Sequence, residues 1–274
     1  MRSLGGLAAI VALAIVFSAC ALVSPGPSPS GTPELLQDRT PLIRQLTQKV
    51  AERDRALVSM QTDAVMEYSA PDRHPPRVRE QIIAKRPDSL RVEALSAFNV
   101  ALVVATSGNQ LAIFEPSRNR LTRATASAET LNQFIQIPMA PADAVTLLLG
   151  IAPDSATLAA RAPDAIVTEG AMTVASWRLE NSARRELGFQ DDQLAMVRMR
   201  DGDGTIDYEV RYGEYQDLGG LMFPYTVDAT FPKARSRISF HYKRPIINGQ
   251  VPDSVFVLSP SRAGEQGNLG DANR

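Results

Sequence analysis

Cysteine is almost absent from this chain: Cys20 is the only one among 274 residues. Without a second cysteine, a disulfide scaffold and a cysteine-based zinc site are both excluded. Histidine is nearly as rare, and neither His74 nor His241 belongs to an HExxH or HxH pattern. Because a zinc site without cysteine would need carboxylates from elsewhere in the chain, we expect no metal site.

The short motifs of common catalytic and nucleotide-binding sites are also missing. No GxSxG, P-loop or GxGxxG sequence is present, so we expect neither an enzyme nor a cofactor. The stretch Asp201-Gly202-Asp203-Gly204 begins like a calcium loop, but Ile206 occupies the position where an EF-hand requires glycine. We interpret this stretch as the turn of a hairpin.

The chain has no excess of charge of either sign. The net charge is −1 and 44% of the residues are hydrophobic, which is typical of an ordinary globular protein. Without a basic patch, we expect no nucleic-acid partner. By length the part after the first 33 residues is one domain or two small ones, and we assign residues 34–258 to a single domain. Residues 259–274 contain one leucine and no aromatic residue, and we predict that they form a disordered tail.

The single cysteine ends a long apolar run at the N-terminus. Arg2 is followed by Leu4–Phe17 without a charged side chain, and then by the small residues Ser18 and Ala19. This order is typical of a secretory signal peptide, which we assign to residues 1–19. The site resembles a bacterial lipobox, whose cysteine becomes the acylated first residue, although Phe17 replaces the preferred leucine. We therefore predict that Cys20 carries lipid.

Two other interpretations of this region remain open. The stretch from Leu4 to Val23 has no charge over 20 residues, which is long enough for an uncleaved membrane anchor. Cys20 could also be a small apolar core residue, although nothing that would fold surrounds it.

The residues after Cys20 have the composition of a tether. Ser24–Pro33 contains only Ser, Pro, Gly and Thr, which favours extended conformations with a reach on the order of 30 Å. We assign residues 20–33 to the lipidated cysteine and its linker. In bacterial lipoproteins an aspartate after the cysteine commonly marks inner-membrane retention. Ala21 therefore implies, by resemblance to that class, an anchor in the outer membrane with the domain facing the periplasm.

Hydrophobic periodicity predicts a strand-rich domain with a few helices. Thr40 and Pro41 are typical of an N-cap and first helical position, and they precede an apolar stripe at helical spacing: Leu42, Ile43, Leu46 and Val50. Two short helices are expected at 127–135 and 141–149. Strands are expected at 56–68, 77–86, 89–96, 99–106, 110–114, 172–180, 184–190, 193–200, 205–216, 222–231 and 235–243. Long antiparallel strands with helices inserted midway favour a mostly β, α+β fold: a curved sheet or partial barrel with helices over one face.

The order of these elements resembles the LolB-type receptors of the LolA/LolB lipoprotein carrier family. Arg91–Pro153 reads as strand, apolar-tipped loop, strand, turn, strand, helix, proline-containing linker and a second helix that ends in Leu149-Gly150-Ile151-Ala152-Pro153. Val210–Asp228 looks like the returning strands of the family, with Phe223-Pro224 in place of Leu-Pro. The resemblance covers most of the mature chain and consists of element order and apolar spacing, without a catalytic signature.

The resemblance implies an antiparallel half-open β-barrel with a helical lid over an apolar cavity that holds acyl chains. It implies a lipid-anchored envelope protein that binds lipid or lipoprotein acyl chains, receives them from a periplasmic lipoprotein carrier, and delivers them to the outer membrane as a monomer. Exposure of an acyl chain to water during transit costs about 0.8 kcal/mol per methylene, so such a carrier needs an apolar lining.

The resemblance also suggests which residues form the site. The expected lining consists of strand residues Leu95, Leu102, Val104, Ile113 and Trp177 and of lid residues Leu131, Phe134, Ile135 and Leu147. For any one of these residues, ordinary core packing is the alternative. In the receptors the hairpin equivalent to Ser96–Asn99 carries an exposed apolar residue that helps lipid enter the membrane, and Phe98 falls at that position. A phenylalanine that folds back onto the core is the alternative there.

A second class of function fits the same pattern. A structural or assembly lipoprotein of the outer membrane could use this fold to bind a protein partner. The two classes differ in the interior of the barrel, because a continuous apolar cavity favours lipid binding, whereas a sheet filled by its own side chains favours protein binding.

The lipobox interpretation predicts that Cys20→Ser abolishes lipid attachment. Labelling of cells with radioactive palmitate should mark the wild-type chain and leave the variant unlabelled as a longer precursor, since the thiol is the acceptor of the lipid. Equal incorporation of palmitate into the variant would rule out acylation of this cysteine.

Overall fold

The computed structural model describes residues 36–71, 75–97, 99–135 and 137–259. The chain divides into two units, Met1–Glu34 and Leu35–Arg274. All core residues of the described part, from Ile43 to Leu258, and the strands of the large sheet belong to the second unit. The predicted signal peptide, Cys20, the linker, Phe98 and the tail from residue 260 lie outside the described residues.

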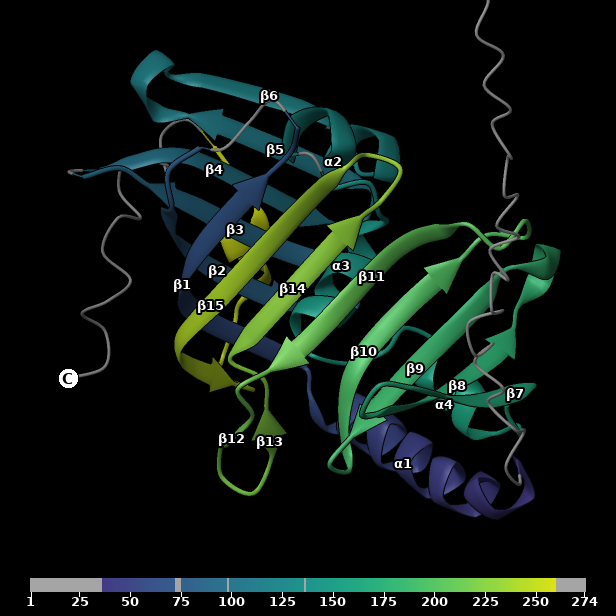
Figure 1. Cartoon of the computed structure of the whole chain (residues 1–274). Helices are drawn as coiled ribbons and strands as arrows, with labels where there is room; N and C mark the ends of the chain where they lie inside the picture. The colour runs from purple at the N-terminus through teal and green to yellow at the C-terminus, as the bar shows by residue number, and fades with distance from the viewer. Residues whose placement is uncertain (1–35, 72–74, 98, 136, 260–274) are drawn as a thin grey trace, which may run out of the picture. The chain divides into compact units, whose positions relative to one another are not determined.

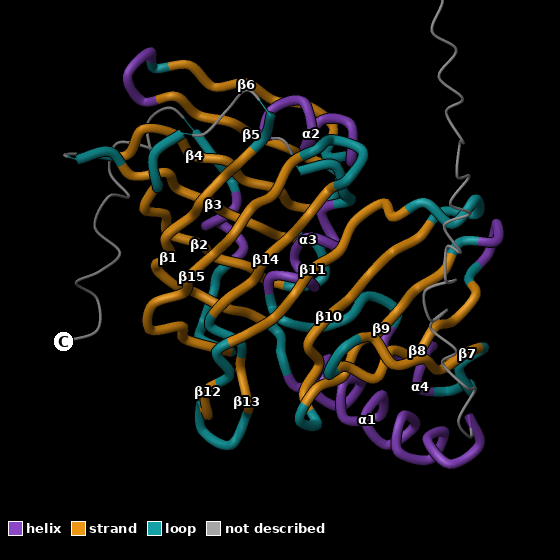
Figure 2. The backbone as a smooth tube through the Cα atoms, viewed as in Figure 1, coloured by secondary structure: helices purple, strands orange, loops and turns teal. Residues whose placement is uncertain are grey.

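One antiparallel sheet of 13 strands dominates the second unit (Figures 1 and 2). Its order is β6-β5-β4-β3-β2-β1-β15-β14-β11-β10-β9-β8-β7, so the first and last long strands pair in the middle. Strands β6 and β7 end the sheet and do not pair with each other, which leaves the barrel half open. The strands are β1 Ser59–Ser69, β2 Val78–Lys85, β3 Ser89–Leu95, β4 Val100–Ser107, β5 Gln110–Glu115, β6 Arg120–Thr125, β7 Ala165–Glu169, β8 Met172–Arg178, β9 Arg184–Gln190, β10 Gln193–Arg200, β11 Ile206–Gly213, β14 Thr226–Phe231 and β15 Ser236–Ile247.

The helices between β6 and β7 connect the two open edges of the sheet. Three α-helices lie between β6 and β7 in the sequence, so the chain crosses from one edge to the other through them: α2 Ala128–Ile135, α3 Pro141–Leu148 and α4 Ser155–Ala159. Helix α1, Leu36–Ala56, contacts α4, β7 and β10. A small hairpin, β12 Gln216–Asp217 and β13 Met222–Phe223, projects below the sheet in Figure 1. Three short 3-10 turns are Pro116–Arg118, Glu180–Ser182 and Asp253–Phe256.

Helix α3 lies inside the curve of the sheet and contacts β2 and β3 on one side. On the other side two tyrosines hold the carbonyl groups at its C-terminal end, which have no partner within the helix. The Tyr212 hydroxyl of β11 donates to the Leu147 carbonyl (3.1 Å), and the Tyr242 hydroxyl of β15 donates to the Leu148 carbonyl (3.0 Å). Burial raises the pKa of both tyrosines, so both remain neutral donors.

The N-terminal end of α3 is held by a buried polar network. The Arg185 guanidinium of β9 donates to the Tyr208 hydroxyl of β11 and to Asp154 Oδ2 (3.4 Å). The Tyr208 hydroxyl lies 3.5 Å from Asp143 Oδ2 in the first turn of α3. Helix α3 is thus tied at both ends to strands on the far side of the sheet from β2 and β3.

The predicted fold class is confirmed: a mostly β chain folds into a large curved antiparallel sheet with a few helices. The hairpin turn at Asp201–Gly204 is also present, with the Asp201 N–H donating to the Thr205 carbonyl (2.9 Å). The predicted start of the first helix at Thr40 was wrong, because α1 begins at Leu36 and contains Pro41. Pro41 is the sixth residue of α1 and lacks an N–H, so the helix continues through it without one backbone hydrogen bond.

Several short elements were not predicted. Strands β6 and β7 are edge strands with mostly exposed or half-buried residues, so they lack a clear alternating pattern. Helix α4 has only five residues, fewer than periodicity can identify. The predicted strand at 205–216 covers β11 and the first residue of β12, and the predicted strand at 222–231 covers β13 and β14.

The tyrosine contacts predict that Tyr242→Phe destabilises the fold, because the buried carbonyl of Leu148 loses its partner. We expect a loss of about 1–2 kcal/mol in the free energy of unfolding, measured by urea denaturation. Tyr225→Phe is the matched control, since the Tyr225 hydroxyl has no hydrogen-bond partner among the described residues and its loss should cost much less. Equal effects of the two substitutions would contradict a role for Tyr242 in holding α3.

Candidate functional site

A cavity of about 610 Å³ lies between the curved sheet and helices α2 and α3. Its volume is within the range of about 300–1,000 Å³ that is usual for small-molecule sites. The wall is almost entirely apolar and combines strands from both sides of the β1–β15 pair with the two helices. The lining residues are Met66, Tyr68, Pro75, Val78, Glu80, Ile82, Leu90, Val92, Ala94, Leu102, Val104, Phe134, Ile137, Met139, Ala144, Leu147, Leu148, Val210, Val227, Ala229, Phe231, Ile238 and Phe240.

Strand alternation explains why these residues face one space. On β2 the inward positions are Val78, Glu80 and Ile82, while Arg79 and Gln81 between them are exposed. On β4, Leu102 and Val104 face the cavity, whereas Val103 packs on the opposite face with Phe114 and Leu258. The strand β4 is therefore covered on both sides, which accounts for its nearly continuous apolar sequence.

Several lining residues remain partly accessible to solvent. They are Tyr68, Pro75 and Val78 near the end of β1 and the start of β2, Phe134 and Ile137 at the end of α2, and Met66, Val92, Ala94 and Leu102 along the sheet. Phe134 keeps 39% of its surface exposed. The deeper wall residues, such as Ile82 and Leu147, are almost fully buried. The cavity is thus a pocket with an apolar rim.

Four of the residues expected in the lining are brought together by the structure. Leu102 and Val104 of β4, Phe134 of α2 and Leu147 of α3 all line the cavity. They come from three elements that are separated by up to 45 positions in the sequence, as the difference between positions 147 and 102 shows.

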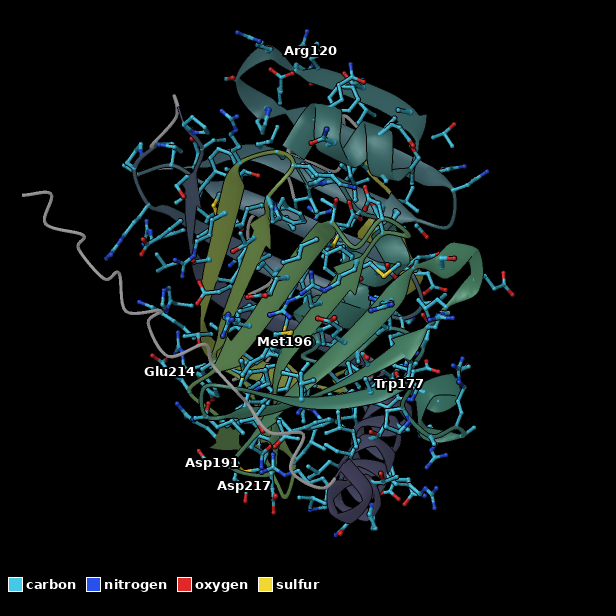
Figure 3. All side chains as sticks on the ribbon, turned by 45° about the vertical axis from the view of Figure 1, so that its right-hand side comes forward. Arg120, Trp177, Asp191, Met196, Glu214 and Asp217 are labelled. Carbon is cyan, nitrogen blue, oxygen red and sulfur yellow. The ribbon has the colours of Figure 1, made fainter. Side chains whose placement is uncertain are left out.

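The other expected residues lie elsewhere. Ile113 and Leu131 pack with Val104 and Leu111 in a cluster that holds α2 against β4 and β5. Leu95 ends β3 at a register shift and is not part of the cavity wall. Trp177 is buried on β8, far along the sheet toward α4 (Figure 3), and its indole N–H donates to the Arg161 carbonyl (3.4 Å). Of the Ile135 side chain nothing is described, and Phe98 lies outside the described residues.

The hairpin that would present Phe98 is nonetheless defined by its flanks. The Ser96 N–H donates to the Asn99 carbonyl (2.8 Å), and the Asn99 N–H donates to Ser96 Oγ (3.2 Å). A tight turn therefore joins β3 to β4 at the predicted place.

Glu80 is the cavity residue that sequence reasoning missed. It is the only charged side chain among the described residues of the lining, and it is 6% exposed. Its Oε2 atom has no hydrogen-bond partner in the described part of the chain. Burial raises the pKa of Glu80 from 4.5 to about 7. The signal was available in the sequence, since a glutamate interrupts the apolar positions at 78, 82 and 84 of one strand face.

A group of buried charges around Arg198 is paired within the protein. Arg198, on the face of β10 opposite the cavity, contacts Glu169 (3.0 Å), Glu186 (2.7 Å) and Glu209 (2.6 Å). Its hydrogen bond lowers the pKa of Glu169. Met196, which is labelled in Figure 3, is two residues from Arg198 on β10 and therefore lies on the same face. The described part of the chain contains no cluster of His, Cys, Asp or Glu suited to a metal ion. No helix within it is long and apolar enough to cross a membrane.

Comparison with known proteins identifies the fold through structure alone. No protein-family model matches the sequence, and no curated protein matches it. Among solved structures, a DUF1329 family protein from Desulfovibrio piger has a TM-score of 0.55 at 9% identity, covering 80% of this chain and 97% of its own. A LolA superfamily protein from Nitrosomonas europaea has a TM-score of 0.51 at 14% identity, covering 77% of this chain and 97% of its own.

A third structure carries the name outer membrane lipoprotein-sorting protein and comes from Vibrio parahaemolyticus. Its TM-score is 0.50 at 9% identity, and the match covers 78% of this chain and 95% of the other. At these identities the likeness establishes the fold. This chain therefore has the half-open barrel fold of LolA-superfamily structures, and the narrower LolB-type assignment stays a prediction.

The position of Glu80 predicts a specific pH dependence of stability. Between about pH 4.5 and pH 7 the folded chain keeps a proton that the unfolded chain releases, so wild-type stability falls as pH rises through this window. Glu80→Gln removes the titration. The unfolding free energy of Glu80→Gln minus that of the wild type should grow by about 3 kcal/mol between pH 4 and pH 8, as measured by urea denaturation.

Glu67→Gln is the control for this prediction. Glu67 lies on the other face of β1, partly exposed and paired with Arg77 (2.8 Å), so its removal changes the net charge equally but alters stability little. A difference between Glu80→Gln and wild type that stays constant with pH would show that Glu80 titrates normally.

Proposed function

We propose that the cavity binds acyl chains of lipids or lipoproteins and that the protein acts as a lipid-binding carrier or receptor in the bacterial envelope. The observation that carries this proposal is the cavity of about 610 Å³, which has an almost wholly apolar wall and an opening to solvent. An interior of this kind is unusual, because protein cores are normally packed without voids larger than a water molecule.

The energetics favour an apolar chain as the occupant. Moving a methylene group from water into an apolar site contributes about 0.8 kcal/mol, so a chain of ten or more carbons gains several kcal/mol from such a wall. Helix α3 is fixed at both ends, so the cavity can exist without the helix collapsing onto the sheet. The partly exposed residues at the rim, including Phe134 and Ile137, offer an apolar path for the chain to enter.

The more specific role that we propose is that of a receptor at the outer membrane. In this role Cys20 carries the lipid anchor, a periplasmic lipoprotein carrier supplies the cargo, and Phe98 assists the release of acyl chains into the membrane. Two structures with the same fold bear names that refer to the LolA superfamily and to outer-membrane lipoprotein sorting, which supports a function of this type. We propose a binding and carrier activity without catalysis.

The alternative, a lipoprotein that only binds a protein partner, is less well supported. That function would leave the interior of the sheet filled with side chains, as it is around Trp177 at the far end. The strands from β4 to β11 along the sheet instead enclose the cavity together with α2 and α3, and this favours lipid binding over the alternative.

Filling the cavity tests this function. Leu102 is half-buried in the wall, at the edge of the cluster that contains Val104 and Leu131, so Leu102→Trp should place an indole in the space of the ligand. We expect the affinity for a lipid with a fluorescent acyl chain to fall at least about tenfold, which corresponds to the loss of about two buried methylenes.

The control is Val167→Trp, which adds the same ring at a position on β7 that is 51% exposed and remote from the cavity. Its affinity should equal that of the wild type. The cavity is not a binding site if the wild type binds no lipid and Leu102→Trp lowers the free energy of unfolding by about 1–3 kcal/mol, the loss typical of an overpacked core.

A further inference from the structure

The side chains next to Glu80 leave open space beside its buried carboxyl group, which ordinary core packing does not explain. Across the sheet it lies in one row with Ala94 of β3 and Ala64 of β1 as its immediate neighbours. The row continues to Leu102 of β4 on one side and to Tyr242 of β15 on the other. Because both immediate neighbours are alanines, no large side chain of this row stands directly beside the carboxyl group. The space next to it is open to the cavity.

The groups that face Glu80 do not neutralise it. The Tyr242 hydroxyl donates its hydrogen bond to the Leu148 carbonyl (3.0 Å). The remaining charges on neighbouring strands lie on the other face: Arg79 of β2 is exposed, and Arg91 and Glu93 of β3 pair with each other (2.5 Å). Tyr68 carries the one hydroxyl group among the described lining residues, and no lysine or arginine is present among them.

We propose that Glu80 is a recognition site for the ammonium group of an amphiphile whose apolar chain occupies the cavity. This inference rests on the proposed function of the cavity and adds the chemistry of the ligand's polar end. A buried carboxyl group without a partner costs free energy, and an evolved apolar wall would use leucine or valine at this position. An ammonium ion supplies both the hydrogen bonds and the opposite charge that the carboxylate lacks.

The same arrangement selects against other amphiphiles. An anionic head, such as a carboxylate, would meet a second negative charge in a site whose described lining residues include no cation. A neutral hydroxyl would gain a single hydrogen bond. The depth of Glu80 also fits a head group: it stands between the half-buried Val78 near the opening and the fully buried Ile82.

Binding of an ammonium amphiphile must then be linked to protonation of Glu80. The carboxylate is the form that binds, and burial raises its pKa to about 7 in the empty cavity. The affinity for an amine should therefore rise by about tenfold for each pH unit up to about pH 7 and level off above it. The affinity for a neutral alcohol of equal chain length should not change with pH.

The test uses residues 35–274, the unit that contains the whole core, and the displacement of N-phenylnaphthylamine, an uncharged apolar fluorophore. Decylamine, decanol and decanoate are compared at pH 5.5 and pH 8 in the wild type, Glu80→Gln and Glu67→Gln. In the wild type and in Glu67→Gln, decylamine should bind at least about tenfold tighter than decanol at pH 8 and lose this preference at pH 5.5. In Glu80→Gln the preference should vanish at both pH values, while decanol binding is retained.

Lysophosphatidylethanolamine, whose ammonium is accompanied by a phosphate, identifies the source of the group. A Glu80-dependent gain for this lipid as well points to a zwitterionic lipid head, and a gain for decylamine alone points to a simple amine. If the wild type binds decanol and decylamine equally at pH 8, the inference fails while the proposed lipid-binding function stands. If neither amphiphile displaces the fluorophore, both fail.

Discussion

The structure depends on holding apolar surface open inside a half-closed barrel. Folding normally removes such space, because close contact between apolar side chains is favourable and gaps lose it. Here the sheet curves around helix α3, and directional hydrogen bonds fix that helix at a set distance. The tyrosines Tyr212 and Tyr242 hold one end, and the network of Arg185, Tyr208 and Asp143 holds the other. These polar contacts prevent the collapse that the hydrophobic effect alone would favour.

The same constraint explains the division of the sheet into two regions. Around β7 to β10, apolar side chains such as Trp177 and Leu187 pack in the core, and α1 and α4 pack nearby. From β4 to β11 along the sheet the wall leaves space for a ligand, with small residues such as Ala94 and Ala144 among the lining. The packed region thus contributes stability to the fold, and the middle of the sheet supplies the site.

The sequence predicts the elements better than it predicts the site. Period-two patterns identify β2 to β5, and the apolar stripes identify α2 and α3, because these signals are local. Membership in the cavity is not local: Leu102 and Trp177 are both apolar strand residues, and only the pairing of the sheet decides that one faces a cavity and the other a packed core. Glu80 was overlooked because its strand is recognised from the apolar residues around it, although its inward position follows from alternation with Val78 and Ile82. Capping residues and periodicity cannot define the start of α1 or identify a helix as short as the five-residue α4.

The central claim is that the cavity holds an acyl chain, and it is tested most directly by native mass spectrometry of residues 35–274, without the predicted lipid anchor, purified from bacterial cells without detergent. The account predicts a wild-type population whose mass exceeds that of the polypeptide by one or two lipid molecules, released on collisional activation and identifiable by fragmentation. A wild-type protein that carries only the mass of its polypeptide, and that takes up no lipid when mixed with bacterial lipid extract, would contradict the account.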